Sequence, residues 1–227
     1  MMRSGPGPAR SGVVLALLLS LLLAAFGSTA GPAQAAPSPF PTAASVKDAV
    51  FGTGSWSARN WGAEGTIGGR PAACRSDQQM VAHRARGARS YYGATTGSVW
   101  MSSEVEVLRY RSVAEARQDL RRSGSYPRRC PRVTEWVCEE CDGISTTWRT
   151  RVAVQRAGSE SVGWSFKRVD NLKAVGYTMV ARRGTTLVLV TLTLTRDVFG
   201  ANGWVYPRLP RKAAIVRLAR LAIRTAT

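Results

Sequence analysis

A series of four β-rich runs in the second half of the chain restricts the fold more than any other feature of the sequence. The runs cover residues 144–155, 161–169, 174–182 and 185–195. Only Arg183-Gly184 separates the last two runs, which is typical of a tight hairpin. Parallel strands need crossover connections of about a dozen residues or more, so these short connections favour an antiparallel meander. The last run, TTLVLVTLTLT, is rich in Val, Leu and Thr and is predicted to be a central strand.

Helical patterns surround these runs. Residues 112–122 begin with Ser112 and carry Glu115 three positions later, which is a capping box, and Ala116 and Leu120 lie on one apolar stripe. We expect this helix to end at Ser123-Gly124-Ser125. Further helices are expected over residues 43–50, 74–89 and 210–226, a strand over 99–110, and loop or short irregular strands over 51–70. This order predicts a single α+β domain over residues 43–227, with helices packed on an antiparallel sheet.

The start of the chain has the pattern of a secretory signal peptide. Two arginines precede the apolar run 13–26, and the small residues 33–35 follow it at the positions that signal peptidase recognises. The run is shorter than the roughly 20 residues that a membrane-spanning helix needs, so an uncleaved anchor is the less favoured alternative. We therefore expect residues 1–35 to be a signal peptide cleaved before Ala36, and the Pro-rich residues 36–42 to be a linker. The mature protein would be secreted, with no stable membrane anchor.

The net charge of +18 has two interpretations. Among 32 basic residues, 28 are arginine, and arginine codons are rich in G and C, so genome composition can explain the excess. The functional interpretation is attraction to polyanions, such as anionic lipids or anionic polymers of the cell surface. We expect no specific nucleic-acid partner.

Four cysteines, an even number in a secreted chain, predict two disulfide bonds, with three possible pairings left open. They are Cys74, Cys130, Cys138 and Cys141. The last two have the spacing of a redox dithiol, but four acidic residues crowd them. Glu135, Glu139, Glu140 and Asp142 would raise the thiol pKa and leave less reactive thiolate. A structural zinc site would normally need a second paired spacing, so we predict no metal site.

No catalytic pattern is evident. The chain has one histidine, His83, and lacks the Gly-x-Ser-x-Gly sequence that would place a nucleophilic serine. The glycines of residues 65–69 are not followed by the Lys-Ser/Thr pair of a phosphate-binding loop. We therefore predict no catalytic residue and no cofactor.

Aromatic residues near the expected loops are the best candidates for ligand contacts, because they could line a groove for sugars or an apolar ligand. These candidates are Trp56, Trp61, Tyr91, Tyr92 and Trp100. Trp148, Trp164 and Tyr177 lie within expected strands and are assigned to the core instead.

One combination of motifs resembles a known family. It consists of a strand at 104–110, a capped Ala-rich helix at 112–120, Cys130-Pro131, a Val/Leu strand at 187–194 and a closing helix at 213–223. This combination resembles the actinobacterial extracellular sensor domains, typified by the C-terminal domain of PknH-type receptor kinases. The resemblance covers residues 43–227 and implies a sandwich-like α+β domain with disulfides and a cleft for an unidentified ligand.

The chain departs from that family at one position: Tyr126 stands where members often carry a tryptophan before the cysteine at the helix end. It also shows no lipobox and no kinase domain, so the expected function is that of a free-standing binding module. We thus predict a secreted, disulfide-stabilised, non-catalytic domain that binds a small-molecule or cell-envelope ligand. The alternatives are a small secreted hydrolase that modifies the envelope, and a cationic protein that binds anionic surface polymers.

Overall fold

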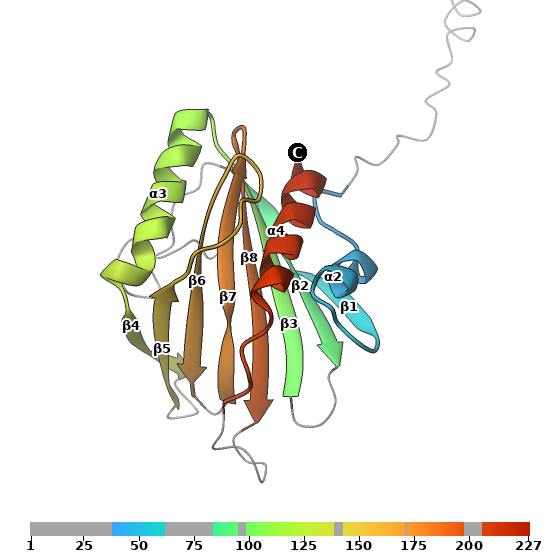
Figure 1. Ribbon diagram of the computed structural model, residues 1–227, viewed down its shortest axis with the longest axis vertical. Coiled ribbons are helices and arrows are strands. Elements are labelled where there is room, and N and C mark those ends of the chain that lie inside the picture. The colour runs from blue at the N-terminus through green and yellow to red at the C-terminus, as the bar shows by residue number, and fades with distance from the viewer. Residues whose placement is uncertain (1–37, 62–83, 95–98, 139–142, 171, 198–205) are drawn as a thin grey trace, which may run out of the picture. The chain divides into compact units, whose positions relative to one another are not determined.

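The β-rich runs pair into one open antiparallel sheet of eight strands, in the order β1-β2-β3-β8-β7-β6-β5-β4 (Figure 1). The strands are β1 (Trp56–Trp61), β2 (Arg84–Ala94), β3 (Val99–Arg109), β4 (Arg132–Cys138), β5 (Gly143–Arg151), β6 (Glu160–Val169), β7 (Leu172–Arg183) and β8 (Thr186–Asp197). Three helices accompany them in the described part of the chain, α2 (Ala43–Ala49), α3 (Val113–Arg129) and α4 (Lys212–Ala226). The predicted α+β fold, with helices packed on an antiparallel sheet, is confirmed, and β8 is central as expected.

The computed structural model describes residues 38–61, 84–94, 99–138, 143–170, 172–197 and 206–227. The compact unit that contains them is Ser38–Thr227. In these ranges no helix has both the length and the apolar character needed to cross a bilayer.

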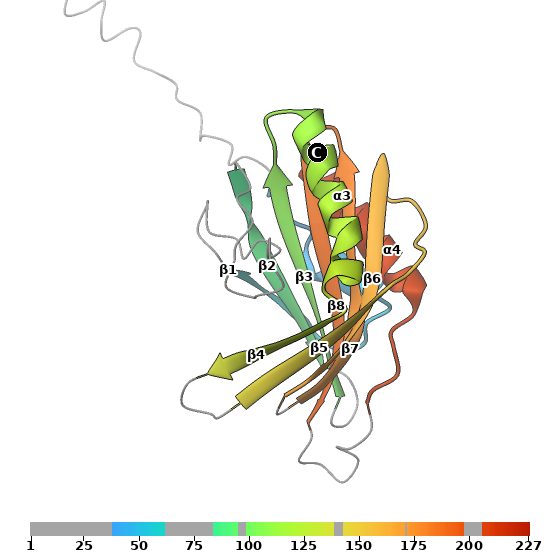
Figure 2. The same cartoon turned by 90° about the vertical axis from the view of Figure 1, so that its left-hand side faces the viewer.

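The two faces of the sheet hold two separate apolar cores, because successive side chains of a strand point to opposite faces. Val105 and Val107 of β3 belong to a core with α2 and α4, whereas Leu108 belongs to a core with α3. We call these sides of the sheet the α4 face and the α3 face. Figure 2 shows α3 and α4 on opposite sides of the sheet, and it shows β4 and β5 turned well away from the direction of β3 and β8. This rotation is the accumulated twist of a large sheet.

Helix α3 begins as the capping box predicts, with the Ser112 hydroxyl accepting a hydrogen bond from the Glu115 amide. It does not end at Ser123-Gly124-Ser125, however, but continues to Arg129. Gly124 lies so close to β6 that a Cβ there would stand 3.0 Å from a methyl group of Val162. The small residues therefore permit close packing on the sheet, and the expectation that they end the helix is wrong.

Helix α4 closes the α4 face with the apolar stripe that the sequence predicts. Ile215, Leu218, Ala219 and Ala222 are fully buried in the core shared with β3, β7 and β8. Phe40 joins the same core. The second half of the segment expected to be a linker thus packs against the domain.

Two strands differ from expectation. A helix is predicted over residues 74–89, but Arg84–Ala94 forms β2, and residues 74–83 lie outside the described ranges. The β2 sequence is rich in Arg and Gly and has little intrinsic strand preference, so pairing with β1 and β3 on its two sides decides its conformation. β4, in the cysteine region, is likewise defined by its pairing with β5.

Candidate functional site

Two of the five candidate aromatic residues are engaged in packing on the α4 face. The Trp56 ring lies so close to Gly93 that a Cβ on this glycine would stand 2.1 Å from it. Tyr91 is fully buried, and its hydroxyl donates a hydrogen bond to the Pro41 carbonyl oxygen at 2.8 Å. Burial raises the pKa of Tyr91 to about 12, although nearby Arg89 acts to lower it. Trp56 is partly buried and Tyr91 fully buried, so both contribute to packing on this face, and a ligand contact by either stays a prediction.

Tyr92 and Trp100 lie instead on the α3 face, next to each other. Tyr92 pairs with Ser102 across β2 and β3, and Trp100 precedes Ser102 by two positions, so the two aromatic residues are diagonal neighbours. Diagonal partners of this kind are within reach of aromatic side chains. Tyr92 is half exposed, at 50%. The backbone of Trp61 belongs to β1, but its side chain lies outside the described residues.

A row of polar side chains on β3 and β8 lies next to these two aromatic residues. Trp100 pairs with Thr195, Ser102 with Thr193 and Glu104 with Thr191. We call this set the polar strip: Tyr92, Trp100, Ser102, Glu104, Thr191, Thr193 and Thr195. The core under α3 includes Leu108, Leu187 and Leu189 of the same two strands, and no member of the polar strip belongs to it. The α3 face therefore has a leucine-rich part under the helix, which also holds buried Glu106 and Arg182, and a polar part beyond it.

Glu104 provides the carboxyl group of the polar strip. Burial raises its pKa above the usual value, and the positive charge of Arg168 opposes this shift. Arg168 also forms an ion pair with Asp170, with 3.2 Å between Nε and Oδ2. A carboxyl group in this setting takes up a proton more readily than one in water, and it can then both donate and accept hydrogen bonds.

Of the four predicted disulfide cysteines, the structure describes the side chain of Cys130. Cys130 lies at the end of α3, where it is buried and disulfide-bonded. The side chains of Cys74, Cys138 and Cys141 lie outside the described residues, so the pairing stays a prediction. The side chains of His83 and of the acidic residues around Cys138 also lie outside them. Within the described ranges, no group of three His, Cys, Asp or Glu residues could hold a metal ion.

The threonines of the polar strip were not predicted as site residues from the sequence. Thr191, Thr193 and Thr195 alternate with leucines in TLTLT, and this alternation was a usable signal for a polar sheet face. Glu104 alternates with Val105 in the sequence, which predicts that it lies on a polar strand face, but only the pairing of β3 with β8 places Ser102 and Glu104 beside the threonines.

No protein-family model matches the chain, and no curated protein matches it. Among solved structures, the extracellular domain of PknH from Mycobacterium tuberculosis is similar, with a TM-score of 0.49 and 9% identity over 81% of this chain and 92% of that one. An uncharacterized protein from Mycobacterium smegmatis is also similar, with a TM-score of 0.39 and 12% identity over 83% of this chain and 98% of that one. The first is the extracellular domain of PknH, after which the family that the sequence motifs resemble is named. Similarity at this level says nothing of ligand or activity.

Proposed function

We propose that this protein is a secreted, non-catalytic domain that binds a hydroxyl-rich ligand of the cell envelope on the polar strip. One observation carries the proposal: beyond the part of the α3 face that the helix covers, β2, β3 and β8 bear hydroxyl groups, two aromatic residues and a carboxyl group with a raised pKa. A sheet face that serves only to bury a helix has no need of these groups.

The residue types suit a sugar ring. The rings of Tyr92 and Trp100 can pack against the apolar face of a sugar, and their polar atoms can also form hydrogen bonds. The hydroxyl groups of Ser102 and Thr193 and the carboxyl group of Glu104 can then orient the sugar hydroxyls, as a few convergent polar groups do in ligand sites.

The proposed compartment is extracellular. The expected signal peptide, residues 1–35, would direct the chain out of the cell and be removed before Ala36. Disulfide bonds among the four cysteines would persist in that oxidising environment and stabilise the domain.

Native mass spectrometry of the mature protein, secreted and purified in high salt, tests whether a ligand is bound. We expect a discrete additional mass. A glycan array then tests the chemical class, and we expect Trp100→Ala to weaken binding by about tenfold or more. Trp148→Ala is the matched control, because Trp148 of β5 lies outside the polar strip and, contrary to its expected place in the core, is partly exposed. A bare chain that binds no glycan would refute the proposal, as would an equal loss of binding in the two variants.

A hydrolase is the second candidate, and two carboxyl groups favour it. Glu104 and Glu106 lie on the same face of β3, two positions apart, so their Cα atoms are separated by about 7 Å along the strand. This spacing is compatible with an inverting glycosidase, in which an acid with a raised pKa protonates the leaving group. Loss of sugar release in Glu104→Gln with binding retained would favour the hydrolase, and binding without any turnover in the parent protein would favour the binding domain.

A further inference from the structure

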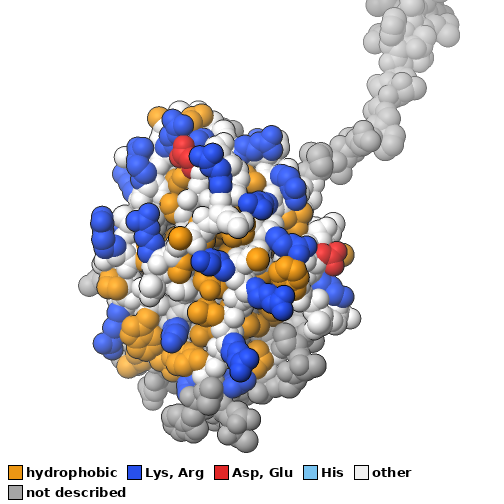
Figure 3. Space-filling view, viewed as in Figure 1, with side chains coloured by type: hydrophobic (Ala, Val, Ile, Leu, Met, Phe, Trp, Pro, Cys, Tyr) orange, Lys and Arg blue, Asp and Glu red, His pale blue; other side chains and the backbone are white. Residues whose placement is uncertain are grey.

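A pocket of about 400 Å³ lies beside α4, on the other side of the domain from the polar strip. Its lining consists of Gly158, Ser159, Arg183, Arg220, Ile223 and Arg224. Three of these six residues are arginines. Figure 3 shows many Lys and Arg side chains over this side of the molecule and few acidic ones.

The pocket is built on a loop that is fixed to the end of β7. Gly158 has a φ of +69° and forms an isolated bridge with Arg182, and a Cβ on it would stand 2.4 Å from the Arg182 carbonyl oxygen. The Ser159 amide donates to the same carbonyl oxygen at 2.7 Å. Glycine is therefore required at position 158, and the loop holds the Ser159 hydroxyl at the edge of the pocket.

Two of the arginines are held in place by neutral oxygen atoms. Nε of Arg220 donates to the Arg156 carbonyl oxygen at 3.1 Å, and Nη1 of Arg183 donates to the Thr227 hydroxyl at 3.3 Å. These contacts orient the guanidinium groups but leave their charges uncompensated. Arg220 and Arg224 are also four residues apart in α4, a spacing at which like charges repel each other.

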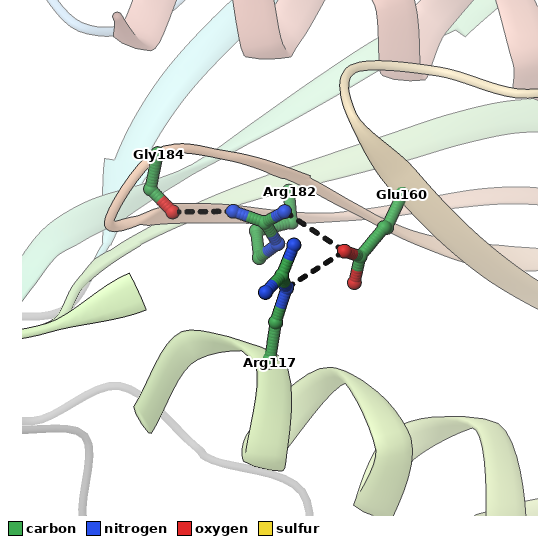
Figure 4. A network of polar contacts seen from close by, with 4 residues as sticks. All are labelled: Arg117, Glu160, Arg182 and Gly184. Atoms are coloured by element: carbon green, nitrogen blue, oxygen red, sulfur yellow. Dashed lines mark hydrogen bonds and ion pairs between the residues drawn. The ribbon is translucent and has the colours of Figure 1, made fainter. Parts of the chain in front are cut away.

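Glu160, which follows Ser159 in the chain, is already paired with other arginines. Glu160 Oε1 accepts hydrogen bonds from Nη2 of Arg182 at 2.9 Å and from Nε of Arg117 at 2.8 Å, and Arg182 also donates to the Gly184 carbonyl oxygen (Figure 4). The hydrogen bond from Arg182, and then the one from Arg117, hold the pKa of Glu160 below its usual value, so it is ionised and paired. Among the residues that the structure describes, no ion pair involves Arg183, Arg220 or Arg224.

We infer that this pocket binds a phosphate group, as a phosphomonoester or phosphodiester. Guanidinium groups match phosphate oxygens with paired hydrogen bonds, and three of them can compensate the charge of such an anion. The lining also includes Ser159, whose hydroxyl can add a donor. The site does not depend on the function proposed for the polar strip, which lies on the opposite face of the sheet.

Two sources of the phosphate group are distinguished by the choice of probe. Binding of glycerol 3-phosphate and of inorganic phosphate, followed by amide NMR shifts at Gly158 and Ser159, tests a free phosphate or phosphate ester. Sedimentation with phosphatidylglycerol vesicles, with and without glycerol 3-phosphate as competitor at constant ionic strength, tests a lipid headgroup. Saturable binding in either experiment at about 0.15 M salt supports the phosphate site, and its absence in both overturns it.

A charge-matched pair of variants separates the pocket from general surface charge. We expect the double variant Arg220→Gln and Arg224→Gln to weaken binding at least about tenfold. The control, Arg121→Gln and Arg122→Gln, removes the same charge from exposed positions of α3 and should change binding less than about twofold. Equal weakening in the two double variants would overturn the proposal, because it would mean that only net charge matters. Unfolding temperatures within about 2 °C of the parent protein would show that both variants are folded.

Discussion

Replacing Gly176 by alanine tests how closely the sheet is packed beside the polar strip. Gly176 of β7 pairs with Phe166 of β6 on one side and with Thr193 of β8 on the other. A Cβ on Gly176 would stand 2.1 Å from the Leu192 carbonyl oxygen and 2.7 Å from the Phe166 ring. The ring can turn aside, but the oxygen belongs to the backbone of a central strand, so β8 itself must shift.

The expected cost follows from two opposing effects. Forcing an extra methyl group into a well-packed core costs about 1–3 kcal/mol. Alanine also reduces the conformational entropy of the unfolded chain, which raises the free energy of unfolding by about 0.4–1 kcal/mol. With values from the middle of both ranges, the net loss in the free energy of unfolding should be about 1.3 kcal/mol, which lowers the unfolding temperature of a domain of this size by about 3–5 °C.

Urea unfolding followed by far-ultraviolet circular dichroism measures this loss. Gly124→Ala is the matched control: its Cβ approaches a Val162 methyl group at 3.0 Å, and the helix gains about 0.5–1 kcal/mol from alanine. The free energy of unfolding of Gly124→Ala should lie within about 0.5 kcal/mol of that of the parent protein. Adding Phe166→Leu should not recover the loss in Gly176→Ala, because the contact with the Leu192 oxygen remains. Full recovery, or a Gly176→Ala variant as stable as the parent, would refute this account of the packing.

Three further predictions concern stability. Ser112→Ala should cost about 0.5–2 kcal/mol of unfolding free energy in a urea titration, because the hydroxyl accepts the Glu115 amide at the start of α3, and Ser112→Asn should cost much less. The pKa of Glu160 is lowered in the folded state, so ionised Glu160 stabilises the fold above its unfolded pKa, and this stabilisation is lost as pH falls. The difference in unfolding free energy between the parent and Glu160→Gln should therefore shrink in acid. The pKa of Glu104 is raised instead, so its charged form lowers the stability of the fold at neutral pH. Glu104→Gln should therefore be more stable than the parent protein at pH 7. Thermal scans should show this advantage disappearing as pH falls through the raised pKa of Glu104. A constant difference across the pH range would contradict either expectation.

Much of the fold could be predicted from local sequence. The alternation in TLVLVTLTLT predicts a strand, the Ser112 and Glu115 pair predicts where α3 begins, and the apolar stripe of α4 predicts which side of that helix is buried. These predictions succeed because each depends on residues a few positions apart. The errors at β2 and at the end of α3 have the opposite origin. An Arg-rich segment becomes a strand because two neighbours pair with it, and Gly124 continues a helix because Val162 of β6 lies against it.

The candidate sites depend even more on tertiary structure. The aromatic residues were evident in the sequence, but Tyr91 and Tyr92 are adjacent there and look alike. Because successive residues of β2 point to opposite faces of the sheet, Tyr91 is buried in the core and Tyr92 is half exposed. The arginine pocket joins the ends of β7 and α4 to the loop before β6, segments about 25–65 residues apart in the chain. By itself, then, the sequence determined the secretory pattern, the basic charge and most of the elements, which follow from composition and short-range periodicity. Tertiary structure alone decided which hydroxyl groups align beside Glu104 and which arginines line one pocket, because strand pairing and helix packing set distances that no local pattern encodes.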